Sequence, residues 1–367
     1  MDVCLPFNDS PVIDTYSYHA NIVSIISNYN ELKPWIYQRF LRLTYCKDDS
    51  YLDFCDGDYF DYYKCKVLYA DGKRYLAEFR NNNFFNETDV TEDIALGDVT
   101  AFLIQCLNNN SYIFIHLDHY FIKGSDPYKK FHRNHESVVY GYNMDERVFY
   151  VSDNFVVGKY VGLQISFTDL ELARKSSEDY ELKRVLQVSI RKGSSVSIDV
   201  KGIHNKLSDY LSSRDSSCYG IITKTNDNQY YHNEFKYDWH WYSRSNKDEK
   251  FVYGINIHRF LKEDLRKNCS DKSALDLRRY QALLNHKIVI RELVVLLLEY
   301  SLLCDGEDVI HAIKQSVKQT LIIRNYAIKY NLTRDTRILD KIMNFHENSM
   351  LSEKKLFRNI LTNLKVN

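Results

Sequence analysis

Proline and paired cysteines are scarce in this sequence of 367 residues. The four prolines all lie within the first 127 residues, so no proline interrupts a helix in the rest of the chain. The eight cysteines are scattered, and no two of them form a C-x-x-C pair. This spacing gives no indication of a structural zinc site or of a disulfide framework, and we expect free thiols.

Net charge and long apolar runs are also absent. Lys+Arg and Asp+Glu both number 49, so no overall field attracts nucleic acid or an anionic membrane. The longest apolar run, 288–303, contains Arg291 and Glu292 and is too short to span a bilayer. Met1-Asp-Val-Cys has neither the basic nor the apolar region of a signal peptide. We therefore expect a cytoplasmic protein that binds neither nucleic acid nor a membrane.

Apolar and aromatic residues, in contrast, are plentiful. At 44% hydrophobic and 14% aromatic, the chain can form one large core or two smaller ones. Short helical and strand-like runs alternate over residues 1–195, whereas residues 196–367 are mostly helical outside a polar, tyrosine-rich loop at 212–252. Helices followed by an antiparallel sheet are an α+β order. We predict an α+β N-terminal domain over 1–195 and a mostly helical C-terminal domain over 196–367.

The hydrophobic patterns also predict individual elements. Strands are expected at 112–117 and 185–190. Helices are expected at 18–29, 34–45, 99–107, 167–175, 200–211, 255–265, 275–302, 309–330 and 333–364. The 212–252 loop is interpreted either as a ligand lid or partner surface or as an irregular loop, and the aromatic residues behind the first interpretation are Tyr230, Tyr231, Trp239 and Trp241.

His135 and Asp153 are the most informative pair of residues. Both ends of the run that joins them are rich in β-branched and aromatic residues, and Asn143-Met-Asp-Glu146 has the composition of a turn. A hairpin folded about Met144 places residue 135 opposite residue 153, with Cβ atoms about 5 Å apart. An imidazole beside a carboxylate is typical of an oriented catalytic base. The alternative is a polar pair on an exposed hairpin.

Four stretches of sequence together resemble a known family. They are Tyr16–Ile26 with Pro34–Tyr37, Tyr112–Tyr120 with His135–Tyr142, Tyr253–Phe260, and Asp276–Lys287. Their order and spacing are similar to those of the butirosin biosynthesis protein H family, whose N-terminal domain is related to papain-like and C39-like cysteine peptidases. The resemblance implies a papain-like fold for residues 1–195, with a cleft where the first helix meets the 135–153 hairpin.

The resemblance also implies an acyltransferase-like enzyme of natural-product assembly, including pathways that make nonribosomal peptides. Such an enzyme transfers an acyl or aminoacyl group from a carrier-protein thioester to an amine and forms an amide. His135 would be the base and Asp153 its orienting partner. The implied partners are an acyl or peptidyl carrier protein and a small-molecule amine acceptor.

The sequence departs from the family where the nucleophile should be. Catalytic members begin the first long helix with a cysteine, whose pKa the helix N-terminus lowers. Here Thr15–Ala20 contains no cysteine, which is similar to a branch with an aromatic–His–Ala run at this place. Ser17 is either a replacement nucleophile or a helix cap. His19 is either a second acid/base group or a histidine packed under the helix, and Tyr16 and Tyr18 are expected to contact substrate in the space a thiolate would occupy.

Asp118 and Tyr120 follow the predicted buried strand and are further candidates for substrate contact. Asp118 would bind an amine, or alternatively pair with Lys123 or a backbone donor. His116, Asp118 and His119, with His135 added, are residue types that suggest a metal site. Side-chain alternation, however, sends His119 to the face opposite His116 and Asp118. We therefore predict neither a metal nor a cofactor.

Polar residues of the predicted 275–302 helix form another group. Asp276, Arg278, His286 and Lys287 match the helical motif of the family. We interpret them as a polar network that joins the two domains, or alternatively as a contact for a carrier protein.

The leading hypothesis is acyl or aminoacyl transfer without the usual cysteine. The first alternative is a catalytically degenerate papain-like protein that binds a peptidyl or carrier-protein partner. The second alternative is a peptide hydrolase or amidase. The residue that faces His135 distinguishes covalent catalysis from binding alone, because a nucleophile must lie within hydrogen-bonding reach of its base.

Overall fold

The chain forms two compact units, and neither is continuous in sequence. Unit 1 comprises 1–33 and 61–196, and unit 2 comprises 34–60 and 197–367. The predicted domain boundary at 195/196 lies beside the crossing at 196/197, but segment 34–60 belongs to unit 2. The computed structural model describes residues 2–48, 50–54, 65–70, 73–79, 85–89, 99–176, 185–190, 193–214, 251–304 and 306–366.

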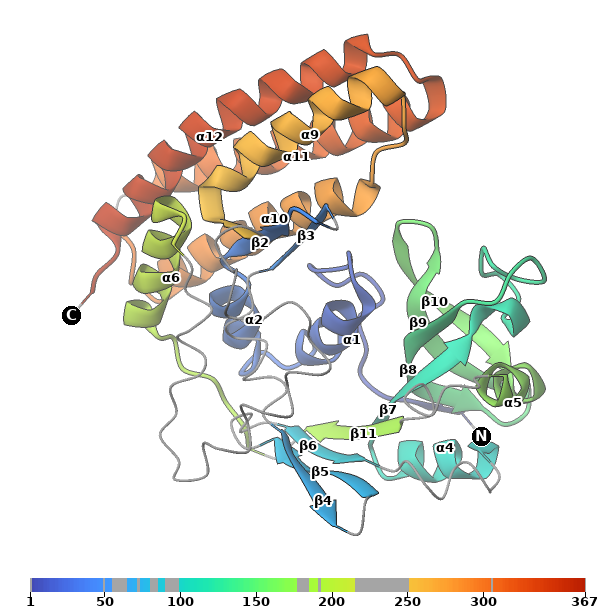
Figure 1. Ribbon diagram of the computed structural model, residues 1–367. Helices are drawn as coiled ribbons and strands as arrows, with labels where there is room; N and C mark the ends of the chain where they lie inside the picture. Colours follow the sequence, from blue (N-terminus) through green and yellow to red (C-terminus); the bar gives the residue numbers. More distant parts are fainter. Residues whose placement is uncertain are drawn as a thin grey trace. The chain divides into compact units, whose positions relative to one another are not determined.

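Unit 1 is built on a seven-stranded sheet (Figure 1). Its order is β10-β9-β8-β7-β11-β6, and β1 pairs with β8 beyond the end of β7. Every described pair in it is antiparallel, in agreement with the predicted mixed α and β class. The strands are β1 (Asp2–Cys4), β6 (Phe85–Asp89), β7 (Tyr112–Asp118), β8 (Asn134–Asn143), β9 (Val148–Val156), β10 (Lys159–Ser166) and β11 (Val185–Ile190). A separate hairpin joins β4 (Cys65–Ala70) to β5 (Lys73–Phe79).

One face of β9 shows why this sheet can hold a functional site. Phe149, Val151 and Phe155 are fully buried, as alternate residues on the covered face of a strand should be. Asp153 stands in the same row and is also fully buried. A carboxylate therefore occupies a position that the strand pattern reserves for a hydrophobic side chain.

Helix α1 (Ser17–Ile26) is the most enclosed helix of unit 1. Nine of its ten residues are buried, the exception being Tyr18, and it packs on β8 and β9. The hydroxyl of Tyr160, on β10, donates a hydrogen bond to the buried Asn21 Oδ1 at 2.8 Å. The other described helices of the unit are α4 (Val99–Asn108), α5 (Phe167–Lys175) and the short 3-10 helix η2 (His119–Phe121).

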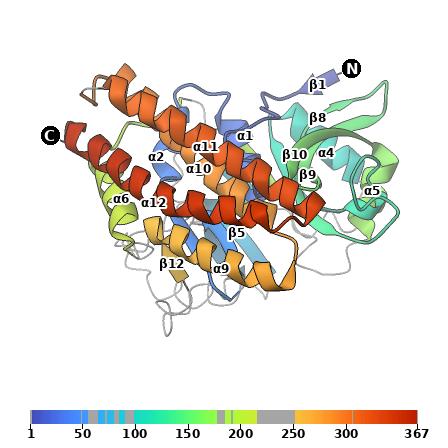
Figure 2. The ribbon, with the colours of Figure 1, turned by 90° about the horizontal axis from the view of Figure 1, so that it is seen from above.

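Unit 2 is mostly helical and also contains a small sheet of order β12-β2-β3. Its strands are β2 (Leu43–Cys46), β3 (Tyr51–Phe54) and β12 (Phe251–Tyr253), and α2 (Lys33–Arg39) begins at the boundary between the units. Figure 2 shows α11 and α12 running alongside each other, and α12 also packs on α9. The remaining described helices are α6 (Val200–Ser212), η7 (Gly254–Asn256), α9 (Ile257–Asp271), α10 (Leu277–Glu299), α11 (Gly306–Thr333) and α12 (Arg337–Asn363).

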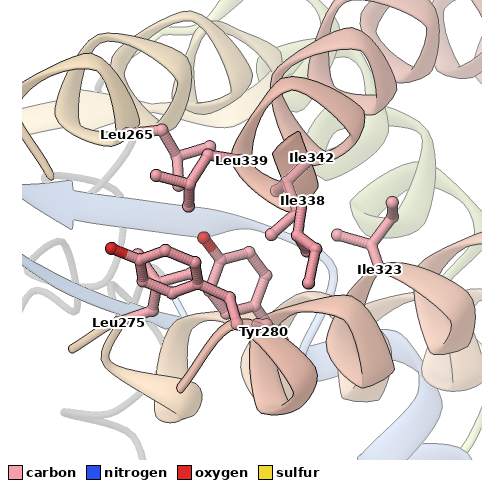
Figure 3. Close-up of a cluster of buried hydrophobic side chains, with 9 residues drawn as sticks. Leu265, Leu275, Tyr280, Ile323, Ile338, Leu339 and Ile342 are labelled. Carbon is pink, nitrogen blue, oxygen red and sulfur yellow. The ribbon is translucent and has the colours of Figure 1, made fainter. Parts of the chain in front are cut away.

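Buried apolar side chains from four helices hold unit 2 together (Figure 3). Tyr280 of α10 lies against Leu265 of α9 and Leu339 of α12, and Ile323 extends the cluster along α11. Each of these side chains is at least 96% buried. Replacing one of these side chains by alanine would lower the free energy of unfolding by about 2–5 kcal/mol, as is typical of large-to-small core substitutions.

Several sequence predictions require correction. The helix predicted over 34–45 ends at Arg39, and residues 43–46 instead form β2, whose partner β12 lies 200 residues further on. Strands β1, β10 and those between residues 65 and 89 were not predicted. Most of the 212–252 loop, with Tyr230, Tyr231, Trp239 and Trp241, lies outside the described residues. Among the described helices, none combines the length and apolar character needed to cross a membrane.

Candidate functional site

Asp153 is the centre of a buried polar cluster in unit 1. Its Oδ1 accepts hydrogen bonds from the backbone N–H of Asn154 at 2.6 Å and from His135 Nδ1 at 2.7 Å. Its Oδ2 accepts from Ser137 Oγ at 2.8 Å and from His119 Nε2 at 2.9 Å, and it also lies 2.9 Å from His135 Nδ1. A fully buried carboxylate is stable only when it is multiply hydrogen-bonded in this way.

The pairing of His135 with Asp153 is present, but the two residues are not directly opposite. Val138 pairs with Ser152, and continuing this register places Ser137 opposite Asp153. His135 is therefore the diagonal neighbour of Asp153, two residues further along β8. The predicted register was wrong because Asn143 pairs with Val148, so the turn is centred between Asp145 and Glu146 and not on Met144. The irregularity between Val139 and Gly141 shifts the pairing back by only one residue. Diagonal neighbours remain within reach of a long side chain.

His119 and Ser137 complete the cluster and were not among the predicted site residues. Leu117 of β7 lies opposite His135, so His119, two residues further on, continues the same face of the sheet. The alternation of side chains along β7 correctly predicts that His119 and Asp118 lie on opposite faces of the sheet. What it did not show is that the face reached by His119 is the one that carries Asp153, because this requires the registers of three strands.

Charge and burial shift the pKa values of Asp153 and His135 in opposite directions. Burial raises the pKa of the Asp153 carboxyl, but the charge on His135 and the hydrogen bonds from both imidazoles outweigh it and hold the pKa well below its usual range. Burial lowers the pKa of His135, but the charge of Asp153 and its hydrogen bond outweigh that effect and raise the pKa above the ordinary value of 6.5. Asp153 is therefore ionised at neutral pH and strengthens His135 as a base.

The start of α1 lies near this cluster. The side-chain amide of Asn154, next to Asp153, donates a hydrogen bond to the backbone oxygen of Asp14 at 3.2 Å. Three residues later Ser17 opens α1 as its first helical residue and is 97% buried. The N-cap is Tyr16, whose side chain makes no capping hydrogen bond, so Ser17 is not the cap.

The aromatic residues predicted at the start of α1 contact one another. The rings of Tyr16 and Tyr18 stack with centroids 5.5 Å apart, and Tyr18 packs edge-on against His19 at 4.4 Å. His19 is 97% buried. Neither Ser17 nor His19 forms a hydrogen bond with His135 in the part of the chain that the structure describes.

Asp118 belongs to a different cluster, at the end of β7. Its carboxylate accepts hydrogen bonds from the backbone N–H groups of Tyr120 and Arg133, from Ser176 Oγ, and from His132 Nδ1 at 2.6 Å. Burial raises the pKa of Asp118, but these hydrogen bonds, that of His132 foremost, outweigh it and lower the pKa. The exposed ring of His132 stacks on the Tyr120 ring at 4.3 Å. Asp118 and Tyr120 thus orient a second histidine.

Neither of the two cysteines of unit 1 whose side chains are described supplies the missing nucleophile. Cys4 pairs with Gly141 in the sheet, six residues along β8 from His135, which is about 20 Å at 3.3 Å per residue. Cys106 is buried in α4, and burial raises its pKa to about 11. Cys46 and Cys304 belong to unit 2.

The polar residues of α10 bond within unit 2. Asp276 caps the helix by accepting from the backbone N–H of Arg278. His286 Nε2 donates to the backbone oxygen of Leu41 at 2.9 Å, and Lys287 forms a buried ion pair with Glu353 at 2.7 Å. Leu41 lies in the predicted N-terminal domain but belongs to unit 2, so these described bonds join distant segments of one unit.

The buried network of unit 2 extends beyond this ion pair. Tyr210 Oη and His258 Nε2 both donate to Glu353, and His258 Nδ1 lies 3.0 Å from His346 Nδ1. Because His258 Nε2 carries a proton for Glu353, a neutral His258 accepts at Nδ1 and His346 donates there. This assignment leaves His346 Nε2 unprotonated, and that atom has no hydrogen-bond partner among the residues that the structure describes.

Comparison with known proteins gives no independent assignment. No protein-family model matches this chain, and no curated protein matches it. The cluster around Asp153 is therefore the feature of the protein from which a function can be proposed.

Proposed function

We propose that unit 1 catalyses acyl transfer to an amine, with His135 as the general base and Asp153 as the group that orients it. One observation carries this proposal. His135 bonds to Asp153 through Nδ1, and its side chain is 30% exposed, so Nε2 is left as the basic atom for a substrate. An ionised carboxylate on the far side of an imidazole fixes its tautomer and stabilises the imidazolium formed during proton transfer.

The arrangement of unit 1 also supports a papain-like N-terminal fold. A buried helix near the start of the chain packs on the strands that carry the histidine and the aspartate. The hydrogen bond between Asn154 and Asp14 brings the start of that helix to the strand that carries Asp153. The resemblance to the butirosin biosynthesis protein H family points in the same direction, and it suggests a carrier-protein thioester as the acyl donor.

The proposed reaction balances without a cofactor. The amine nitrogen attacks the thioester carbonyl carbon while His135 Nε2 removes a proton from that nitrogen. The C–S bond then breaks, and the imidazolium returns the proton to the departing thiolate. The products are an amide and a free thiol.

Direct transfer fits the geometry better than a covalent acyl-enzyme. Covalent catalysis requires a nucleophile within hydrogen-bonding reach of the base. Ser17 makes no hydrogen bond to His135 among the described residues. The thiol-bearing residue Cys4, on β1, pairs with Gly141 and so lies about 20 Å along the sheet from His135. The amine itself is therefore the proposed nucleophile.

The lack of a hydrogen bond between Ser17 and His135 among the described residues also favours a second candidate, a protein that binds an acyl or peptidyl partner without turnover. The stacked rings of Tyr16 and Tyr18 at the start of α1 are suited to holding such a partner. Turnover separates the two candidates.

The test measures amide formation by the full chain from small acyl thioesters and primary amines, by mass spectrometry and by release of the free thiol. We expect a His135→Gln variant to lose about 100-fold to 10,000-fold of the rate, the range typical of a general base. His132→Gln is the matched control, because it removes an imidazole that is also bonded to an aspartate, and it should leave the rate unchanged.

Two further results discriminate between the mechanisms. Retention of the rate in Ser17→Ala, without an acyl adduct on the wild-type protein, supports direct transfer, whereas loss of the rate together with such an adduct establishes Ser17 as the nucleophile. A protein that binds an acylated carrier protein tightly but accelerates no transfer supports the binding candidate and refutes the enzyme.

A further inference from the structure

We propose that His119, His135 and Asp153 form a binding site for a divalent transition-metal ion. One ligand atom from each residue lies within 4.8 Å of the other two, and within the described part of the chain this is the one group of histidine, cysteine and carboxylate side chains with that property. The inference goes beyond the proposed acyl transfer, which requires no metal.

The spacing of the ligand atoms indicates the kind of ion. Asp153 Oδ2 lies 2.9 Å from His119 Nε2 and 2.9 Å from His135 Nδ1. Two ligands with metal bonds of 2.0–2.1 Å are about 2.9 Å apart when they meet at a right angle, and about 3.4 Å apart at the tetrahedral angle. Both separations from Asp153 Oδ2 are ordinary N–H···O hydrogen-bond lengths, and they also fit neighbouring positions of an octahedral ion better than tetrahedral ones. Two histidines and one carboxylate are the ligand set of six-coordinate Fe²⁺, and nitrogen–oxygen sites of this kind also take Mn²⁺, Co²⁺ or Ni²⁺.

The surroundings of the three residues are those of a prepared site. Ser137 Oγ and the backbone N–H of Asn154 bond to the Asp153 carboxylate and fix its orientation, as outer groups do around metal ligands. His119 is fully buried, and among the described residues its side chain has one hydrogen bond, to Asp153, while its Nδ1 has no partner there. Burying a polar ring that makes only one hydrogen bond has a cost in free energy. Binding of a metal ion at Nε2 would account for the burial of His119 at this position.

Access to the site is through His135, which is partly exposed while the other two residues are fully buried. An ion held on one side by three protein atoms retains open positions on the other for water or substrate. Binding at His135 Nδ1 moves the ring proton to Nε2 and removes the basic atom that acyl transfer needs. A bound ion is therefore expected to inhibit the proposed transfer.

The test uses the full chain, purified without a histidine tag and freed of metal by a chelator that is then removed. Titration with Co²⁺, followed by calorimetry and visible absorption, should show one ion per chain with the weak absorption of a six-coordinate site. His119→Phe keeps an aromatic ring against Phe155 and should weaken binding by about 100-fold or more, beyond the loss typical of an outer-shell change. His132→Phe removes the other aspartate-bonded histidine and should leave binding unchanged.

Specific outcomes overturn the site. No binding at up to about 1 mM Co²⁺, or equal affinity in wild type and His119→Phe, refutes it. If His119→Phe does not fold by circular dichroism, His135→Phe, at the more exposed ligand, takes its place with the same expectation. Acyl transfer by metal-free protein that binds no added ion refutes the metal site alone, and ion binding by a protein whose metal-free form shows no transfer refutes the proposed function alone.

Discussion

The buried histidines of unit 2 predict a loss of stability in mild acid. Burial, reinforced by the neighbouring charge of Lys287, lowers the pKa of His286 from 6.5 to about 3. Burial, reinforced by His258, also lowers the pKa of His346, well below its ordinary value. Both imidazoles are fully enclosed and stay neutral in the folded unit, while the same groups in the unfolded chain take up protons below about pH 6.5. The stabilisation is therefore complete above that pH and is lost as the pH falls from 6.5 toward the folded-state pKa.

The magnitude follows from the linkage between protons and folding. A histidine that takes up a proton only in the unfolded chain lowers the free energy of unfolding by about 1.4 kcal/mol for each pH unit below its unfolded-state pKa. Between pH 7 and pH 5, His286 alone removes about 2 kcal/mol from the free energy of unfolding, and His346 adds a similar amount. Their sum of about 4 kcal/mol is a large part of the total stability of a typical domain.

Unit 2 can be followed separately from unit 1. The three tryptophans of the chain, Trp35, Trp239 and Trp241, all fall within the sequence ranges of unit 2. Urea unfolding monitored by tryptophan fluorescence at pH 7, 6 and 5 therefore reports the stability of that unit. His286→Gln places an amide N–H where Nε2 donates to Leu41 and has no titrating group. We expect this variant to lose about half of the dependence on pH.

The control is His311→Gln, an exposed histidine on α11. This variant should keep the full wild-type loss between pH 7 and pH 5. Equal losses in wild type and His286→Gln would show that burial of a neutral His286 is not the cause, and the reasoning from burial and charge would be refuted.

Two further predictions concern the core of unit 1. Tyr160→Phe removes the hydrogen bond to Asn21 and leaves a buried amide oxygen unsatisfied, so we expect a loss of about 1–3 kcal/mol in chemical denaturation, and a loss below about 0.5 kcal/mol would contradict the bond's role. Gly141→Ala places a Cβ 2.5 Å from the backbone oxygen of Val3 and 2.7 Å from the Tyr150 ring, so β1 must shift. We expect a cost of about 1–3 kcal/mol and faster hydrogen exchange at β1, and unchanged exchange there would refute the close approach.

The general base itself predicts a dependence of the transfer rate on pH. His135 acts in its neutral form, and Asp153 raises its pKa above 6.5. The rate should therefore rise with pH through a value above that of a free histidine. Replacing Asp153 by Asn should move this midpoint downward, because the charge that raises it is gone, and a midpoint that stays in place would show that another group titrates.

Local sequence patterns determined much of the fold. Helix α5 and strand β11 occur at the residues predicted, because each has a period and boundaries that can be recognised within about ten residues. The helix predicted over 34–45 failed for the opposite reason. Residues 43–46 are a strand because they pair with β12, and no pattern near residue 43 contains that information.

The site shows the same division between local and distant information. The alternation in β8 and β9 indicated that His135 and Asp153 share a hairpin, and the contact is present although the register differs. The part played by His119 depends on where β7 pairs with β8, and then on where β8 pairs with β9. Such a relation among three strands cannot be read from one sequence. Sequence reasoning therefore paired the Asp153 carboxylate with His135 and missed its second imidazole, His119.

The pairing of β2 with β12 has a consequence for synthesis on the ribosome. About 200 residues separate the two strands, and at 5–20 residues per second their translation takes roughly 10–40 s. During that interval β2 and β3 can form a hairpin, but the edge of β2 that β12 will occupy is unpaired. The nascent chain therefore carries an open strand edge until residue 253 has emerged, and unit 2 completes its fold only after all of unit 1 has been made.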